Sequence, residues 1–207
     1  LADSGIASRA ALDVYLTTFY GRNGAAIEHA RRVASASVRI AVALGIDEPM
    51  LGHIDRAALL HDIGKLAVPE DILHKSGPLT SDEQALARSH VDVAFRTIEH
   101  SPFLAPSAEI VLATREHYDG SGHPYGLVGP AIPIGARIVA VAEAYDALTS
   151  AADGADPVPK RSACAQLVLE AGLRFDPNVI RAWLRCLDLD NDAWRAPGEA
   201  PLHGGRA

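Results

Sequence analysis

The sequence predicts an all-α domain, a bundle of helices packed around an aliphatic core. Apolar residues recur at the three- and four-residue intervals of a helical face along several long segments. No segment alternates apolar and polar residues in the way that predicts a strand. Hydrophobic residues make up 48% of the 207 residues and aromatic residues only 5%. The core must therefore consist mainly of Ala, Val, Leu and Ile, which favours closely packed helices.

Helices are expected where this spacing coincides with residues that begin or end a helix. They cover residues 8–20, 25–44, 47–61, 80–100, 107–112, 138–148, 164–169 and 177–187. Gly45 is expected to end the second helix. Asp47 is expected to cap the third, with Pro49 in its first turn, and Gly64 to end it just after the His61–Asp62 pair. Thr80 and Glu83 have the spacing of a capping box, which predicts the start of the fourth.

Glycine and proline mark the main interruption of this pattern, a loop expected over residues 119–133. We expect one domain over residues 1–187, with its core at about 25–150 and its C-terminal helices at 160–187. Residues 188–207 have little periodicity and are expected to form a flexible tail.

The charge and composition argue against several classes of partner. A formal net charge of −7 disfavours binding to DNA or RNA, because their phosphate backbones attract a basic protein surface. No uncharged stretch reaches the roughly 18 apolar residues of a membrane span, and the N-terminus lacks a signal-peptide pattern. Cys164 and Cys186 are too few for a disulfide framework and are expected to be reduced. We therefore expect a cytoplasmic protein without a membrane span in this chain.

The pair His61–Asp62 is the most informative feature of the sequence. His29 lies on an earlier expected helix, His90 on a later one, and Glu143 or Asp146 on a fourth could join them. Imidazole and carboxylate groups that project inward from separate helices form metal sites in helical bundles. Nitrogen and oxygen donors without thiolates suit iron, manganese, zinc, nickel or a magnesium-like ion. The sequence therefore predicts a metal site between helices.

Several motifs together resemble the HD-GYP branch of the HD-domain metal-dependent phosphohydrolases, over about residues 27–187. They are His29, the run His61-Asp-Ile-Gly-Lys65, His90, the loop Asp119-Gly-Ser-Gly-His-Pro-Tyr-Gly-Leu127 and the run Ile132-Pro-Ile-Gly-Ala-Arg-Ile138. The resemblance implies an HD-domain helical bundle with about two or three metal ions between its helices, often iron or manganese. It also implies a phosphodiesterase acting on cyclic dinucleotides, typically cyclic di-GMP.

The resemblance assigns a role to each matching position. The expected metal ligands are His29, His61, Asp62, His90 and Glu143. Asp62 would bridge two ions and Lys65 would assist the substrate phosphate, so these two are the expected catalytic residues. The residues expected to face a substrate or partner are Arg115, Asp119, Gly120, Gly122 and His123. The expected cofactor is one or two divalent ions, with iron or manganese favoured and zinc or nickel as alternatives.

The chain departs from the family pattern at the expected second ion. Family members carry two consecutive histidines where this chain has Thr114 and Arg115. Arg115 would either replace the missing ion, as a cation opposite Asp62, or fill the site and prevent the chemistry. His117, three residues after Thr114, could turn inward as a substitute ligand.

Other departures affect the rest of the site. The aspartate that closes the first ion's site in the family is here Glu143, which is one methylene longer, and the tyrosine that names the branch is His123. A cationic stretch of the family is replaced over residues 151–156. Arg137 is expected to pair with a buried carboxylate, for which Asp119 is the candidate.

Three functions stay open on the sequence. The matches at the first ion's site favour a working phosphodiesterase whose partner is a cyclic dinucleotide. Thr114 and Arg115 favour a degenerate domain that senses a nucleotide or binds signalling proteins such as diguanylate cyclases. Hydrolysis of another phosphate ester with a single ion is the third.

Overall fold

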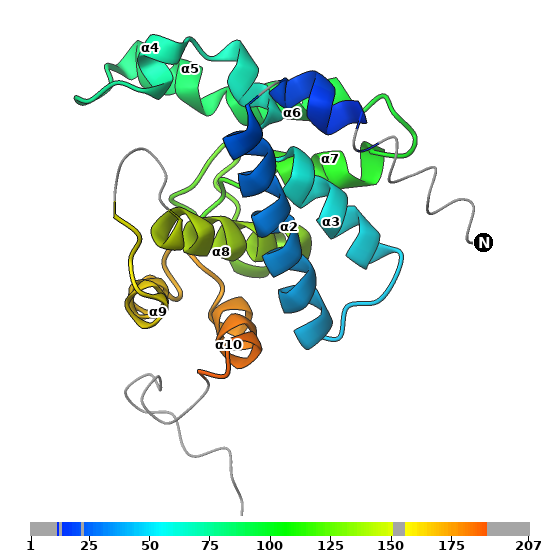
Figure 1. Ribbon diagram of the computed structural model, residues 1–207, viewed down its shortest axis with the longest axis vertical. Coiled ribbons are helices and arrows are strands. Elements are labelled where there is room, and N and C mark those ends of the chain that lie inside the picture. Colours follow the sequence, from blue (N-terminus) through cyan, green and yellow to red (C-terminus); the bar gives the residue numbers. More distant parts are fainter. Residues whose placement is uncertain (1–11, 13, 22, 151–155, 190–207) are drawn as a thin grey trace, which may run out of the picture.

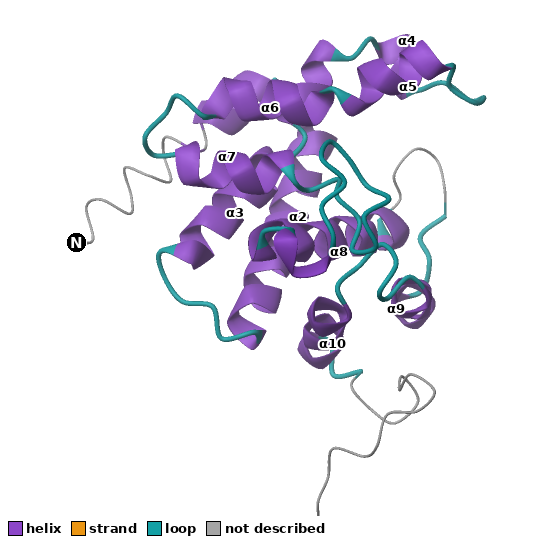
Figure 2. Ribbon diagram, turned by 180° about the vertical axis from the view of Figure 1, so that it is seen from behind, coloured by secondary structure: helices purple, strands orange, loops and turns teal. Residues whose placement is uncertain are grey.

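The computed structural model describes residues 12, 14–21, 23–150 and 156–189 (Figure 1). Over these residues every regular element is a helix (Figure 2), so the all-α prediction is confirmed. Residues 14–20 are helical. The elements that follow are α2 (Gly24–Ala43), α3 (Met50–Leu60), the 3-10 helix η1 (Ile63–Ala67), α4 (Glu70–Leu73), α5 (Ser81–Arg88), α6 (His90–Ile98), α7 (Ala105–Leu112), the 3-10 helix η2 (Gly129–Ala131), α8 (Ile134–Thr149), α9 (Lys160–Leu169) and α10 (Pro177–Cys186).

Helix α2 runs through the bundle and packs against both α3 and α8 (Figure 1). Helix α7 packs on α3 and α8, and α6 packs on α7 and η1. Helices α4 and α5 lie at one end of the molecule, whereas α9 and α10 lie at the other, beside α8 (Figures 1 and 2). The connection after α3 is therefore close to both α2 and α8.

The long helix α2 forms close to where the apolar spacing predicts it. Asn23 caps it by accepting a hydrogen bond of 3.1 Å from the amide of Ala26. Val33 and Ile40 are fully buried, as the predicted inward face requires. Most buried side chains of the described part are Ala, Val, Leu and Ile, which agrees with the core expected from composition.

The prediction of a single helix over residues 80–100 is wrong in one respect, because this segment divides at Ser89 into α5 and α6. The Ser89 hydroxyl donates to the carbonyl of Leu86 at 2.7 Å, and Nδ1 of His90 bonds the carbonyl of Ala87 at 2.7 Å. These side chains take carbonyls that a continuous helix would use for its own ladder. The capping box of Thr80 and Glu83 at the start of α5 is confirmed.

The end of α3 also differs from the prediction, in which Gly64 ended the helix after the His–Asp pair. The helix ends at Leu60, and Asp62 leads directly into η1. Gly64 instead allows η1 to lie directly on α6. A Cβ at this position would collide with the carbonyl oxygen of His90 and lie 2.8 Å from the amide nitrogen of Ala94.

Arg137 pairs with a buried carboxylate, but the expected partner Asp119 is wrong. Nη1 of Arg137 lies 2.5 Å from Oδ2 of Asp176, whose side chain is 1% exposed. Asp119 turns instead to the amide of Ser121, at 2.9 Å, because its short side chain closes the tight turn of its own loop.

Some expectations lie wholly or partly outside the described residues. These are the start of the first helix at 8–11, most of the replaced stretch at 151–156, and the tail beyond residue 189. The proposed domain limits stay a prediction. Among the described helices, none combines the length and the apolar character needed to cross a membrane.

Candidate metal centre

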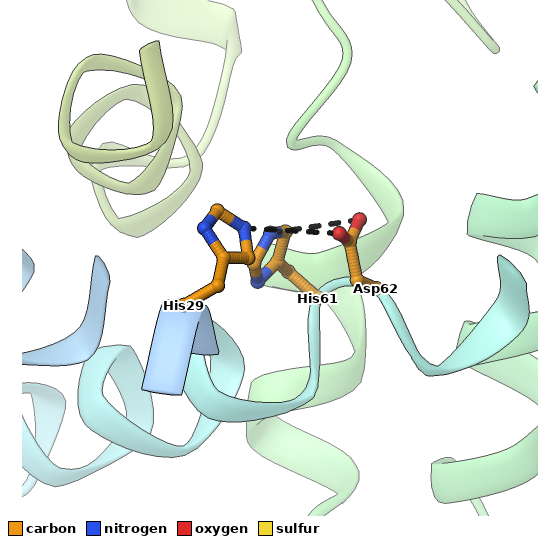
Figure 3. Close-up of side chains that lie close together, drawn as sticks. All are labelled: His29, His61 and Asp62. Atoms are coloured by element: carbon orange, nitrogen blue, oxygen red, sulfur yellow. Dashed lines mark ion pairs between the residues drawn. The ribbon is translucent and has the colours of Figure 1, made fainter. Parts of the chain in front are cut away.

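Three side chains that can bind a metal meet where α2 passes the end of α3 (Figure 3). His29 comes from α2, and His61 and Asp62 immediately follow α3. Nε2 of His29 lies 3.8 Å from Oδ2 of Asp62, and Nε2 of His61 lies 3.5 Å from Oδ1 of the same carboxylate. One donor atom from each residue lies within 4.8 Å of the others. This spacing suits side chains that share one ion.

Each imidazole is held by its other nitrogen, which fixes its orientation. Nδ1 of His29 lies 2.7 Å from Oδ2 of Asp146, and Nδ1 of His61 lies 2.8 Å from the carbonyl oxygen of Ala58. Both partners accept hydrogen bonds, so Nδ1 carries the proton and Nε2 keeps its lone pair. This arrangement, with a carboxylate or carbonyl behind the ring, is typical of metal-ligating histidines.

Nε2 of His61 gives the strongest indication of a metal. His61 is fully buried, and this nitrogen has no hydrogen-bond partner within the described part of the protein. A buried polar atom without a partner costs free energy, so native structures rarely keep one without a reason. A divalent ion bound between His29, His61 and Asp62 would satisfy this lone pair. The residues present therefore fit a divalent metal.

Asp146 supports His29 and is itself held firmly. It accepts hydrogen bonds from Nε and Nη2 of Arg32, at 2.6 and 3.0 Å, and from the hydroxyl of Ser150, at 3.1 Å. Burial raises the pKa of Asp146, but the hydrogen bonds from His29, Arg32 and Ser150 lower that pKa by more. The carboxylate therefore stays ionised and acts behind the histidine.

Asp62 lies between two cations. Its Oδ2 lies 2.6 Å from Nζ of Lys65, and its Oδ1 lies 3.3 Å from Nη2 of Arg115. Burial raises the pKa of Asp62, but the neighbouring His61, Lys65 and Arg115 lower that pKa by more, so the net shift is downward. Lys65 remains 41% exposed and can reach a molecule that enters the site.

The predicted ligands His90 and Glu143 surround Arg115 instead of joining the His29–His61–Asp62 group. Nη1 of Arg115 lies 2.7 Å from Oε1 of Glu143, and Nε of Arg115 lies 3.4 Å from Nε2 of His90. Nδ1 of His90 bonds the carbonyl of Ala87, so its Nε2 is the acceptor here too. Thr114 is buried, and its hydroxyl donates to the carbonyl of Val111 at 2.8 Å.

The loop after α7 returns to this site. Glu116 is buried, and its carboxylate accepts hydrogen bonds from the amides of Tyr125, at 2.7 Å, and Leu127, at 3.0 Å. The amide of His123 donates to the carbonyl of Arg115 at 3.1 Å. Burial, followed by the charges of Arg88, His90 and Arg115, lowers the pKa of His123 to about 4. The loop therefore places a neutral imidazole beside the predicted ligands.

The other residues expected in this loop lie further from the site. His117 does not join the metal group, because its Nδ1 lies 2.9 Å from the hydroxyl of Ser121. Asp119 is exposed, and Gly120 has a positive φ of 87° in the same turn. Gly122 is needed for packing, since a Cβ there would collide with the amide of His117 and lie 2.6 Å from the carbonyl of Arg115.

Sequence reasoning missed the supporting roles of Arg32 and Glu116. Arg32 follows His29 by three residues and so shares its face of α2, which was the available signal. Nothing in the sequence around Glu116 indicates that its side chain holds a loop. The hydroxyl of Tyr20 was also missed. It donates to the carbonyl of Leu59 at 3.2 Å, and burial together with the charge of Asp62 raises its pKa.

A histidine from one helix beside a His–Asp pair from the next defines a class of all-α proteins with a metal site between helices. A family model described as an HD domain matches residues 21–179, and the chain belongs to that family. Its similarity to the HD-GYP branch is also supported by relatives and solved structures.

Two relatives illustrate this similarity. The chain is 40% identical over 166 residues to the cyclic di-GMP phosphodiesterase response regulator RpfG of Xanthomonas campestris, covering 79% of this chain and 44% of the relative. It is 37% identical over 183 residues to a cyclic di-GMP phosphodiesterase of Thermotoga maritima, covering 86% of this chain and 50% of the relative. The chain thus spans half or less of the length of either relative.

A solved structure supports the fold. An HDG"Y"P protein of Bdellovibrio bacteriovorus superposes with a TM-score of 0.63 at 23% identity. The superposition covers 79% of this chain and 52% of the other. It extends the agreement from single motifs to the arrangement of the helices over that part of the chain.

Proposed function

We propose that this domain is a metal-dependent phosphodiesterase that hydrolyses a cyclic dinucleotide, with cyclic di-GMP as the favoured substrate. The observation that carries the proposal is the unpartnered Nε2 of buried His61, placed beside His29 and Asp62. The family membership and the names of the relatives support the reaction class.

In this proposal His29, His61 and Asp62 hold a divalent ion, with iron or manganese favoured for the nitrogen and oxygen donors. A bound ion of this kind lowers the pKa of water and polarises a phosphoryl oxygen. Asp146 keeps the proton on Nδ1 of His29, which leaves Nε2 available as a ligand.

Lys65 is the residue that we assign to the substrate phosphate. Its amine contacts Asp62 at 2.6 Å, yet the side chain is 41% exposed, so it can turn toward an entering phosphate. A cation there stabilises the charge that develops on the phosphate oxygens. His123 is neutral near pH 7 and offers the substrate a hydrogen bond without adding a charge.

The second candidate is a sensing or interaction domain without turnover, and Arg115 is the observation that favours it. Its guanidinium already contacts Asp62 and Glu143, so it could block the chemistry. In this role the domain would bind a cyclic dinucleotide or a signalling protein such as a diguanylate cyclase. A cytoplasmic location suits both candidates and stays a prediction.

The test is to load the purified protein with Mn²⁺ or Fe²⁺, add cyclic di-GMP and measure the linear dinucleotide by chromatography. We expect product from the wild type and none from His61→Ala. The matched control is His100→Ala, because the His100 side chain is 88% exposed and should not affect turnover. Binding of cyclic di-GMP without product would favour the sensing domain, and product from His61→Ala would refute the proposed site.

A further inference from the structure

Arg115 occupies a cage of three side chains that would otherwise suit a cation of another kind. Oδ1 of Asp62, Oε1 of Glu143 and Nε2 of His90 lie 3.3, 2.7 and 3.4 Å from three different nitrogens of its guanidinium. Two carboxylates and an imidazole lone pair are a common donor set for a divalent ion. In this chain the cation at the centre of these three side chains is the guanidinium of Arg115 itself.

The charges of the cage balance without a second ion. Asp62 and Glu143 supply the negative charges, and Arg115 and Lys65 supply the positive ones. A further divalent ion would have to lie beside the guanidinium, where like charges repel strongly at short range. A guanidinium keeps its proton in proteins, so Arg115 cannot relieve that repulsion by becoming neutral.

The backbone around Arg115 is also fixed. Its carbonyl accepts the amide of His123 at 3.1 Å, and Gly122 packs against the same carbonyl. The next residue, Glu116, is buried and holds the loop through two amides. The Arg115 side chain is only 19% exposed, so moving it away would mean rearranging the loop.

We propose that the Arg115 guanidinium permanently fills a second cation position, so that the chain holds one divalent ion, at His29, His61 and Asp62. This inference rests on the proposed function, because it describes the metal content of the same site. A phosphate that enters would then face one ion and one guanidinium. Arg115 can hold a phosphate oxygen through its forked N–H groups, but unlike an ion it cannot activate a water.

The test counts Mn²⁺ per chain by mass spectrometry, after loading and removal of free metal by gel filtration. We expect about one ion for the wild type and for Arg115→Lys, which keeps the charge, and about two for Arg115→His, which opens the cage and adds a ligand. Arg161→His is the matched control, since Arg161 is exposed on α9, and it should stay at about one ion. Paramagnetic resonance adds a second readout, because neighbouring Mn²⁺ ions bridged by Asp62 would be magnetically coupled.

Two bound ions in the wild type would overturn the inference, whatever the variants do. A folded Arg115→His protein that still holds one ion would overturn it as well. Should Arg115→His fail to fold, the counts for the wild type and Arg115→Lys decide, and a second ion in either refutes the proposal. The proposed function fails separately, if the protein with one ion produces no linear dinucleotide. A wild type without any bound ion would sink both.

Discussion

Replacing Asp146 by Asn is expected to weaken metal binding although Asp146 lies outside the group that would share the ion. Oδ2 of Asp146 accepts from His29 and from Nη2 of Arg32, while Oδ1 accepts from Nε of Arg32 and from Ser150. An Asn side chain has one acceptor oxygen and one donor group, so it can serve only one of these sides.

Both orientations of the amide have a cost. With its oxygen toward His29, the amide N–H groups face Nε of Arg32, and two donors meet. With its N–H groups toward His29, Nδ1 of that ring must accept, so the proton moves to Nε2 and the metal loses a ligand. Supporting residues of this kind typically contribute 10- to 100-fold to metal affinity, or about 1.4–2.7 kcal/mol. We expect a loss of that size.

Titration calorimetry with Mn²⁺ measures this loss directly. The matched control is Ser150→Ala, which removes only one hydrogen bond to the same carboxylate, at 3.1 Å, and should change the affinity by roughly 3-fold or less. Thermal melting without metal separates an effect on binding from an effect on folding. Equal Mn²⁺ affinity of Asp146→Asn and the wild type would show that the carboxylate does not fix the His29 tautomer.

Two further predictions concern stability. Gly64→Ala should lower the free energy of unfolding by about 3 kcal/mol, because the added Cβ would collide with the backbone of α6. The Cβ added by Gly24→Ala meets nothing within 4 Å, so this control should be neutral or stabilising. Similar urea midpoints for the two variants would contradict this. Arg137→Ala should cost about 3 kcal/mol or more in urea unfolding, because it leaves the buried carboxylate of Asp176 unpaired. Arg174→Ala, which breaks an exposed pair, should cost about 1 kcal/mol or less, and a comparable loss for both would argue against the role of burial.

The fold could be predicted well where helices follow regular apolar spacing. Helix α2 lies close to its expected limits, because its inward face is apolar and Asn23 and Gly45 delimit it. The break at Ser89 could not be predicted from periodicity. It depends on a hydroxyl and an imidazole that take backbone carbonyls, and apolar spacing does not register such bonds.

Part of the candidate site could also be predicted from the sequence, and part could not. His29, His61 and Asp62 lie together as the motif resemblance led us to expect. From the sequence alone, Arg115 could either replace the missing ion or fill the site and prevent the chemistry. Its contacts depend on how three separate segments pack, and the sequence does not show this. Arg137 was matched to the wrong carboxylate for a similar reason. Asp119 and Asp176 are both plausible partners in sequence, and only the packing of α8 against α10 distinguishes them.

The ion pair between Arg137 and Asp176 limits how far the chain can be shortened from its C-terminal side. Every residue assigned to the metal or the phosphate precedes residue 150, so a chain cut before α9 would look sufficient. Yet Asp176 also caps α10 and joins it to α8 through the ion pair with Arg137. The ring of Trp183 in α10 packs edge-on against the ring of Tyr145 in α8, with 4.9 Å between the ring centroids. The amides of Tyr118 and Asp119 bond the carbonyls of Arg174 and Leu173. Truncation before α9 would thus remove contacts of both the loop after α7 and α8, so we expect the smallest stable unit to extend through α10.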